Sequence, residues 1–411
     1  MTHRSTTGLA AIVAIAALGL SGQALAVESG TCPGEGKINN KLKKSMGAAQ
    51  DASKASDWPT VIAKSQEADA VAVEKTEYEQ FLLHEFKGIA YSQLKQYDNA
   101  AKELEASVAS PCMPEADKPK RYKGLLQMAY QSKQYDKVID FGNKAMASGG
   151  DADIAVFVGN AYYLKNDNQN TKKVLGEFAA KQEQSGKTPD EQTYQILQSA
   201  CLKMDDMACV GEQAEKLVLN YPKQEYWQNM IYLLLQNASS DNKQLLNIMR
   251  LGAANKALKP PQYAEMAQLA IDQGLPGEAQ QVLEQVNASG GFDAKTKDIG
   301  NRLLDQAKKA ATLDKSTLDA QDARAKAKPT GDADIKLGAA YLSYNQPDKA
   351  IEALKRGIGK GQLKDPDEAG LLLGIAYTRS NNKAEADKAF ATVTKNPTMA
   401  RIAKLWTGKS T

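Results

Sequence analysis

The chain has 411 residues, with 52 basic and 49 acidic side chains and a formal net charge of +3. A chain this close to neutral lacks the clustered positive charge on which nucleic-acid binding depends, so we expect no nucleic-acid partner. Two histidines and four cysteines leave few side chains for a zinc site or a histidine-based catalytic triad.

The first 26 residues have the features of a cleaved secretory signal. Arg4 precedes an apolar run over residues 9–20, which is shorter than the about 20 apolar residues that a membrane helix needs. Small residues within 24–26 suit signal peptidase. We therefore expect residues 1–26 to be removed on export to the periplasm, leaving a chain without a membrane span. Residues 27–37 are expected to form a flexible leader.

Internal repeats occupy most of the remaining chain. One clear copy contains the series Leu337, Gly338, Tyr341, Asn345, Ala350 and Leu354. The next has the same spacing in Leu373, Gly374, Tyr377, Asn381, Ala386 and Phe390. Small residues at these positions let two antiparallel helices cross closely, and one such hairpin cannot bury its apolar face alone. The sequence therefore predicts an all-α superhelix, a tetratricopeptide solenoid of about ten helix-turn-helix repeats.

The repeats divide the chain into ranges. Residues 38–293 are expected to form an N-terminal array of repeats, and residues 331–397 a C-terminal pair. Residues 294–330 lack the repeat tyrosines and are interpreted as a degenerate repeat or a hinge. Residues 398–411 are expected to form a capping helix and a tail, because apolar side chains at helical spacing can cover the last repeat.

Turn residues support the predicted hairpins. Asn345 and Gly274 stand between the two helices of their repeats, where a tight turn needs a left-handed backbone. Pro347 and Pro276 follow them and fit the first turn of the second helix, where no backbone donor is lost.

The four cysteines predict disulfides in an oxidising compartment. Cys201 and Cys209 are expected to face each other across the turn of one hairpin, which favours their pairing and leaves Cys32 to pair with Cys112. Geometry decides whether either bridge can close. A redox-active dithiol is disfavoured because the sequence has no Cys-x-x-Cys motif.

No residue pattern indicates catalysis, a metal or a cofactor. His84 is the only histidine beyond the signal, and its apolar neighbours on a helix favour a structural role. The run over residues 31–37 has some features of a phosphate-binding loop but lacks the first glycine, the final Ser or Thr and a preceding strand. The repeat tyrosines keep a fixed relation to the repeat glycines, which favours core packing. We therefore expect a protein that is not an enzyme.

Two stretches resemble one family. They are NYPKQEYWQNMIYLL at 220–234, and DKAIEALKRGIGKGQLKDPDEAGLLLGIAY at 348–377 with ARIAKLW at 400–406. They resemble the periplasmic tetratricopeptide proteins encoded beside TonB, ExbB and ExbD. The resemblance implies an accessory role in energised uptake across the outer membrane. Pro347 departs from the family, which often has a large aromatic residue there.

The leading hypothesis is a periplasmic scaffold whose concave groove, lined by the first helix of each repeat, binds a peptide or helix of a partner protein. TonB-system components are candidate partners. The side chains expected in the groove are Lys123, Gln127, Tyr130, Asn160 and Tyr163. For each residue, the alternative is an ordinary solvated surface position. Alternative functions are a periplasmic chaperone or envelope assembly adaptor unrelated to TonB and, remotely, an enzyme with an unrecognised carboxylate site.

Overall fold

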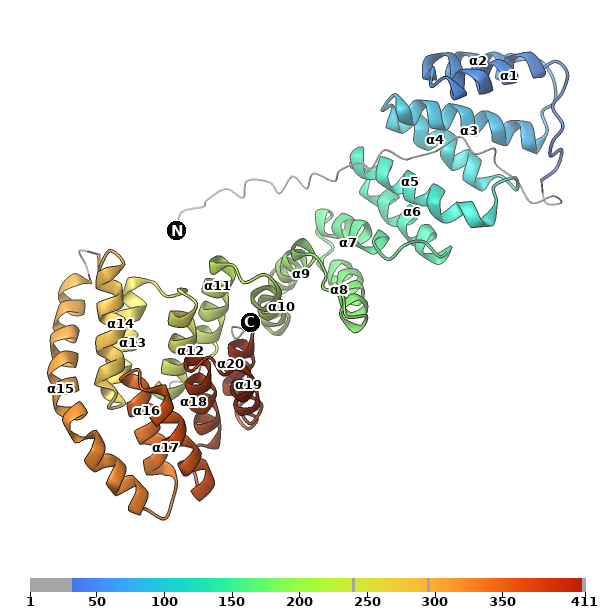
Figure 1. Ribbon diagram of the computed structural model, residues 1–411. Coiled ribbons are helices and arrows are strands. Elements are labelled where there is room, and N and C mark those ends of the chain that lie inside the picture. Colours follow the sequence, from blue (N-terminus) through green and yellow to red (C-terminus); the bar gives the residue numbers. More distant parts are fainter. Residues whose placement is uncertain (1–31, 239–240, 294–295, 409–411) are drawn as a thin grey trace. The chain divides into compact units, whose positions relative to one another are not determined.

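The computed structural model describes residues 32–238, 241–293 and 296–408, and within these ranges the regular elements are helices, with no strand (Figure 1). The expected signal sequence lies outside the described residues. The chain forms two compact units, one up to Ala180 and one from Lys181 onward.

Helices of the first unit form antiparallel pairs. The pairs are α1 (Lys43–Lys54) with α2 (Trp58–Ala70), α3 (Glu77–Gln93) with α4 (Tyr97–Ala109), α5 (Lys118–Gln131) with α6 (Tyr135–Ala147), and α7 (Ile154–Leu164) with α8 (Asn168–Gln184). A short 3-10 helix, η1 (Glu115–Asp117), precedes α5. Glycines mark the crossings, since a Cβ on Gly88 or Gly159 would lie within 2.5 Å of the Leu104 or Leu175 side chain.

In eight of the nine helix pairs, the turn between the two helices contains one described residue with positive φ. In chain order these residues are Ser56, Lys95, Lys133, Asn166, Asp205, Gly274, Asn345 and Asn381. The left-handed turn predicted at Asn345 and Gly274 is confirmed, with φ of 54° and 72°. Most of these turns use a residue other than glycine, so the turn geometry recurs although its sequence varies.

Contacts between alternate helices define an inner face in the first unit. Helix α1 contacts α3, and α5 contacts α7, in addition to the contacts each helix makes with its sequence neighbours. Both contacts join first helices of successive pairs. We call the side formed by α1, α3, α5 and α7 the inner face.

The segment that precedes α1 is attached to the first unit. Cys32 forms a disulfide with Cys112, in the connection between α4 and α5. The Tyr78 N–H donates to the Pro33 carbonyl at 3.4 Å. Residues 32–37, part of the expected flexible leader, thus form a turn that is tied to the first unit.

The second unit contains three helix pairs, then one long helix, two more pairs and a last single helix. The first pairs are α9 (Glu191–Lys203) with α10 (Met207–Asn220), α11 (Gln224–Gln236) with α12 (Asn242–Ala254), and α13 (Pro260–Asp272) with α14 (Pro276–Ala288). The others are α15 (Lys297–Ala327), α16 (Asp332–Ser343) with α17 (Pro347–Lys360), α18 (Pro366–Arg379) with α19 (Lys383–Phe390), and α20 (Pro397–Thr407).

Helix α15 takes the place of the degenerate repeat or hinge expected over residues 294–330. It runs for 31 residues without a turn. Beyond Gly300 its sequence has no glycine or proline and is rich in alanine, lysine and leucine, so nothing ends the helix. The described residues therefore contain nine helix pairs, with α15 at the position of a tenth repeat.

The second unit doubles back on itself after α15. The Gln281 amide on α14 donates to the Ser343 carbonyl at the end of α16 (3.1 Å). Further along, Lys243 of α12 pairs with Glu368 of α18. Helix α20 contacts both α12 and α10. The helices before and after α15 therefore face one another as two opposed rows, which can be followed in Figure 1.

This arrangement covers helices that the repeat pattern placed on an open groove. Nine of the twelve residues of α16 are buried, from Asp334 to Ser343 with only Lys336 excepted. The expectation that the first helix of each repeat lines a groove therefore does not hold for α16 and α18. Helix α20 covers the last helix pair, where the rings of Trp406 and Phe390 of α19 stack with centroids 6.4 Å apart. It also contacts α10 and α12, which a cap of the last repeat alone would not do.

Candidate functional site

The five side chains expected to bind a partner lie on two neighbouring inner-face helices. Lys123, Gln127 and Tyr130 follow one another at helical spacing on α5, and Asn160 and Tyr163 do so on α7. All five are half-buried. Because α5 contacts α7, the five residues lie on neighbouring helices of the first unit.

Tyr130 contributes mainly to packing. Its ring forms T-shaped contacts with the rings of Tyr135 on α6 and Phe157 on α7, with ring centroids 6.3 Å and 5.7 Å apart. Burial, and to a smaller extent Tyr135, raise the pKa of its hydroxyl. Tyr130 therefore fixes α5 against α6 and α7 and offers only part of its ring to a partner.

Lys123 already has an anionic partner. Its ammonium lies 2.7 Å from the Asp151 carboxylate, which precedes α7. The hydrogen bond and the charge of Lys123 lower the pKa of Asp151. Since Asp151 is largely exposed, a partner carboxylate can approach Lys123 only in competition with an ion pair that contributes little to stability.

Gln127 and Asn160 are the amide groups of this surface. An amide side chain offers both a donor and an acceptor, which matches the alternating groups of a peptide main chain. Tyr163 adds a phenol beside Asn160, at low entropic cost for its contact area. Together these groups suit an extended polypeptide better than a small charged ligand.

A buried carboxylate occupies the corresponding position on the preceding inner helix. Glu85 lies ten residues before the turn residue Lys95, as Lys123 does before Lys133. Its carboxylate accepts hydrogen bonds from Ser107 of α4 and Arg121 of α5. Glu85 therefore links three helices and holds α5 in place, a role that the repeat pattern did not predict.

His84 belongs to a cluster of charges between α2, α3 and α4. Its Nδ1 lies 2.7 Å from Glu103, and Lys87 lies 3.1 Å from Glu103 and 2.7 Å from Asp69. Burial opposes the charge of Lys87, but its two carboxylate partners together raise its pKa. The cluster ties one helix pair to the next, which agrees with a structural role for His84. The repeat pattern did not predict this cluster, because Asp69 and Glu103 lie on other helices.

A pocket of about 410 Å³ opens in the second unit, where the segment before α9 meets α10 and α20. The residues that line it are Glu183, Gly186, Lys187, Thr188, Tyr194, Glu212, Glu215, Lys216, Leu219, Asn220 and Lys404. Burial and the Glu183 carboxylate, which accepts a 2.8 Å hydrogen bond from the Tyr194 hydroxyl, raise the pKa of that tyrosine.

The three glutamates of the pocket are neutralised by cations. Lys216 lies 3.0 Å from Glu183 and 3.2 Å from Glu212. Glu215 accepts a 2.8 Å hydrogen bond from Arg401 and also pairs with Lys404. The Glu215 pairs hold α20 to α10.

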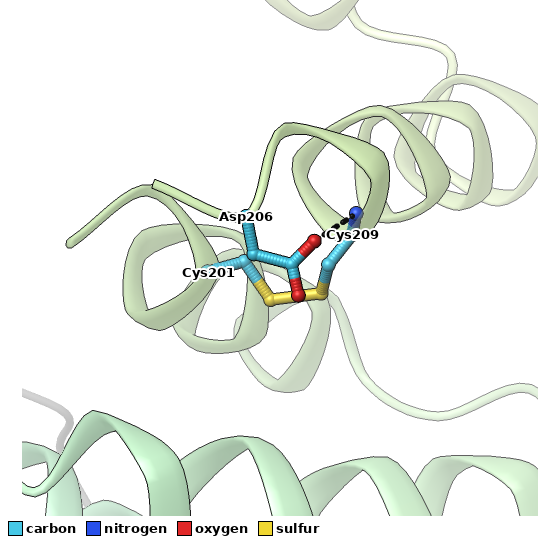
Figure 2. Close-up of side chains that lie close together, drawn as sticks. All are labelled: Cys201, Asp206 and Cys209. Atoms are coloured by element: carbon cyan, nitrogen blue, oxygen red, sulfur yellow. Dashed lines mark hydrogen bonds between the residues drawn. A yellow bond between two sulfur atoms is a disulfide. The ribbon is translucent and has the colours of Figure 1, made fainter. Parts of the chain in front are cut away.

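The turn between α9 and α10 carries the second disulfide, Cys201–Cys209. Asp206 caps α10, and its carboxylate accepts the Cys209 N–H at 3.1 Å. Figure 2 shows this carboxylate beside the two sulfur atoms. The two sulfur atoms and a carboxylate oxygen of Asp206 lie within 4.8 Å of one another. The sequence indicated the disulfide pairing but not the third group.

Within the described ranges, no helix is both long and apolar enough to cross a membrane.

Comparisons with known proteins concern the fold. No protein-family model matches the chain, and no curated protein matches its sequence. Among solved structures, the complex of Naa15 and Naa10 bound to HypK-THB has 13% sequence identity and a TM-score of 0.30, and the match covers 87% of this chain and 64% of that chain. The present chain thus spans under two thirds of that protein.

Two further matched structures belong to proteins or domains whose names refer to a helical repeat. The TPR2AB domain of yeast Sti1, in complex with pHSP90, has 16% identity and a TM-score of 0.24, with 72% of this chain and 93% of that chain covered. The pentatricopeptide repeat protein PPR10 from maize has 13% identity and a TM-score of 0.30, with 82% and 51% covered. The tetratricopeptide-like helical repeat fold of the present chain follows from its own helix pairs and their left-handed turns.

Proposed function

We propose that the chain is a protein-binding scaffold, whose first unit binds an extended segment of a partner protein on the inner face of α5 and α7. The observation that supports this proposal is that Lys123, Gln127, Asn160 and Tyr163 are each half-exposed and lie on two contacting helices. Amide, phenol and ammonium groups there can bond to a peptide main chain while aromatic area adds contact.

The doubled-back second unit supports the choice of the first unit. Inner helices α16 and α18 are covered by α12 and α14 of the same unit, through Lys243–Glu368 and Gln281–Ser343. A partner would have to displace these contacts to reach them. On the face of α5 and α7 the side chains are already half-exposed, and the Lys123–Asp151 pair that a partner would compete with there is a surface ion pair of small energetic value.

The proposed compartment is the periplasm. Both disulfides, Cys32–Cys112 and Cys201–Cys209, are of the kind that persists where thiols are oxidised. The features of a secretory signal in the sequence agree with this location. The sequence resemblance to tetratricopeptide proteins encoded beside TonB, ExbB and ExbD leads us to propose an accessory role in energised uptake. The proposed role includes no catalytic activity.

A matched pair of double variants tests the binding face. We would express Lys123→Ala/Tyr163→Ala, crosslink whole cells and quantify the proteins recovered with the chain. If each residue contributes about 1 kcal/mol or more, affinity should fall at least about 30-fold. The control is Lys137→Ala/Tyr232→Ala, which removes the same residue types from exposed positions on α6 and α11. Equal recovery with both double variants would refute the assignment.

The link to TonB needs a separate measurement. Mass spectrometry of the crosslinked material should identify a TonB-system component that is lost with Lys123→Ala/Tyr163→Ala. A partner outside that system, lost in the same way, would leave the binding face standing and reject the TonB link in favour of a chaperone or assembly adaptor.

A further inference from the structure

Hydrogen bonds in the turn between α9 and α10, in addition to the disulfide, hold two sulfur atoms and a carboxylate close together. The Asp206 N–H donates to the Cys201 carbonyl at 2.9 Å, and the Val210 N–H donates to the Asp206 carbonyl at 3.0 Å. The Asp206 side chain accepts the Cys209 N–H. These bonds fix the end of α9 relative to the start of α10, so the turn keeps its form when the bond between the sulfurs is broken.

We propose that the reduced form of this turn is a zinc site, with Cys201, Cys209 and Asp206 as ligands, and that the Cys201–Cys209 disulfide is the closed form of the same site. Two thiolates and one carboxylate form a donor set that suits Zn²⁺, whose fourth position is open to water or a partner ligand.

The geometry agrees with this assignment. Zinc–sulfur bonds of about 2.3 Å place two thiolates about 3.8 Å apart on a tetrahedral ion. The Cα atoms of Cys201 and Cys209 are 5.8 Å apart, so rotation of the two side chains is enough to reach that spacing. Asp206 lies on the same side of the turn as the sulfurs (Figure 2). The Asp206 carboxylate has two oxygens, one of which accepts the Cys209 N–H.

The position of the turn gives a metal ion access. Leu202 and Met207, the residues that flank the turn, are 59% and 42% exposed, and Asp206 is half-exposed. Cys201 and Cys209 are themselves buried, so the ion enters from the Asp206 side. The first turn of α10 also favours negative charge at this end of the helix.

The chemistry balances with a dithiol as reductant. The dithiol transfers two electrons and two protons to the Cys201–Cys209 bond, which yields two cysteine thiols and an oxidised dithiol. Zinc then binds both sulfurs and displaces the two protons. In the reverse step a second disulfide accepts two electrons from the two thiolates and is reduced to a dithiol with two protons from water. The Cys201–Cys209 bond re-forms and the ion is released, because disulfide sulfurs are poor ligands compared with thiolates. Zinc binding at this turn is therefore controlled by its redox state.

Cobalt binding to the whole chain tests the proposal. The Cys32→Ser/Cys112→Ser variant leaves Cys201 and Cys209 as its only cysteines. After reduction by a phosphine without oxygen, titration with Co²⁺ should give a thiolate-to-cobalt charge-transfer band at one ion per chain. Zn²⁺ should displace it, and the oxidised protein should show none. Circular dichroism confirms that each variant is folded. If this background does not fold, Cys201→Ser/Cys209→Ser in the natural sequence must abolish the band.

Two single variants test the third ligand. Asp206→Asn should weaken Co²⁺ binding by at least about 10-fold, the lower limit for loss of even an outer-shell partner. Asparagine caps helices as well as aspartate does, so the turn should persist. Asp205→Asn removes the same charge one residue away and should bind Co²⁺ as the parent does. Absence of the band from the reduced chain, or equal binding by the two variants, would overturn the proposal.

Discussion

Arg250 of α12 and Glu278 of α14 form a buried ion pair with two hydrogen bonds, 2.7 Å from Nε and 2.6 Å from Nη2. Both side chains are 8% exposed. Burial opposes ionisation of Glu278, but the charge of Arg250 and its hydrogen bonds together lower the pKa of the carboxyl. The pair fixes α12 relative to α14 in the row of helices that faces α18.

Removing one partner of this pair should be costly. Glu278→Gln leaves the Arg250 charge buried without its counter-ion, and we expect a loss of about 3–5 kcal/mol in the free energy of unfolding. Denaturation by urea, followed by circular dichroism, measures it. The control is Asp140→Asn, which breaks the exposed Asp140–Lys144 pair and should change stability by less than about 1 kcal/mol. Similar losses for both variants would contradict the structural role of the buried pair.

Two glycines in one helix pair should respond in opposite ways to alanine. A Cβ on Gly159 of α7 would lie 2.4 Å from the Leu175 side chain, whereas a Cβ on Gly176 of α8 meets nothing within 4 Å. Gly159→Ala should destabilise by about 1–3 kcal/mol through overpacking. Gly176→Ala should stabilise by about 0.5–1 kcal/mol, because alanine favours the helix. Thermal unfolding of both variants checks the sign, and a stabilising Gly159→Ala would show that this crossing is not tight.

The charge cluster around Glu103 should make stability depend on pH. Burial opposes ionisation of Glu103, but hydrogen bonds from His84 and Lys87 outweigh it, and the pKa falls below the ordinary 4.5. A carboxyl whose pKa is lowered by folding stabilises the fold at pH values above its pKa in the unfolded chain. This stabilisation is lost as the pH falls through the pKa of the folded state.

Glu103→Gln should therefore cost about 1–3 kcal/mol at pH 7, since it removes hydrogen bonds to a charged group. The difference from the parent should shrink as the pH is lowered past about 4.5, towards and below the folded pKa. Urea unfolding over this pH range measures both effects. Glu105→Gln, which breaks an exposed pair with Lys137, is the control and should have a small effect throughout. A cost of Glu103→Gln that does not change with pH would contradict the assignment.

The two disulfides should differ in what they contribute. Cys32 and Cys112 are 80 residues apart, and Cys201 and Cys209 are 8 apart. Chain entropy predicts a loss of about 4.5 kcal/mol for Cys32→Ser/Cys112→Ser and about 2.5 kcal/mol for Cys201→Ser/Cys209→Ser. Thermal unfolding of the oxidised variants shows which of the two variants loses more stability. Thiol titration of the unfolded natural chain should find no free thiol, and four reactive thiols would contradict both bridges.

Local features of the sequence predicted most of the fold. A small residue at the crossing and a turn residue such as Asn345 act over one hairpin, and the structure has helix pairs with left-handed turns at these places. The long helix α15 was harder to predict, because the loss of repeat tyrosines shows that a repeat has degenerated without showing what replaces it. The absence of glycine and proline beyond Gly300 was the available signal.

Features that depend on distant residues could not be predicted from repeats. The doubling back of the second unit depends on pairs such as Glu215–Arg401, which lie 186 residues apart and have no periodic pattern. The charge cluster at His84 likewise draws on three helices. At the proposed binding face, helical spacing placed the five residues on α5 and α7. It did not reveal that Tyr130 packs against Phe157 or that Lys123 pairs with Asp151.

The most direct test of the proposed scaffold is photo-crosslinking in cells from single positions of the full chain. A photoreactive amino acid in place of Gln127 or Asn160 lies on the inner face, and the same amino acid in place of Lys137 or Tyr232 lies on an exposed surface elsewhere. We predict that the two inner-face positions crosslink the same partner protein and that the two control positions do not. Equal crosslinking from all four positions, or none from the inner face while a control position captures the partner, would contradict binding at α5 and α7.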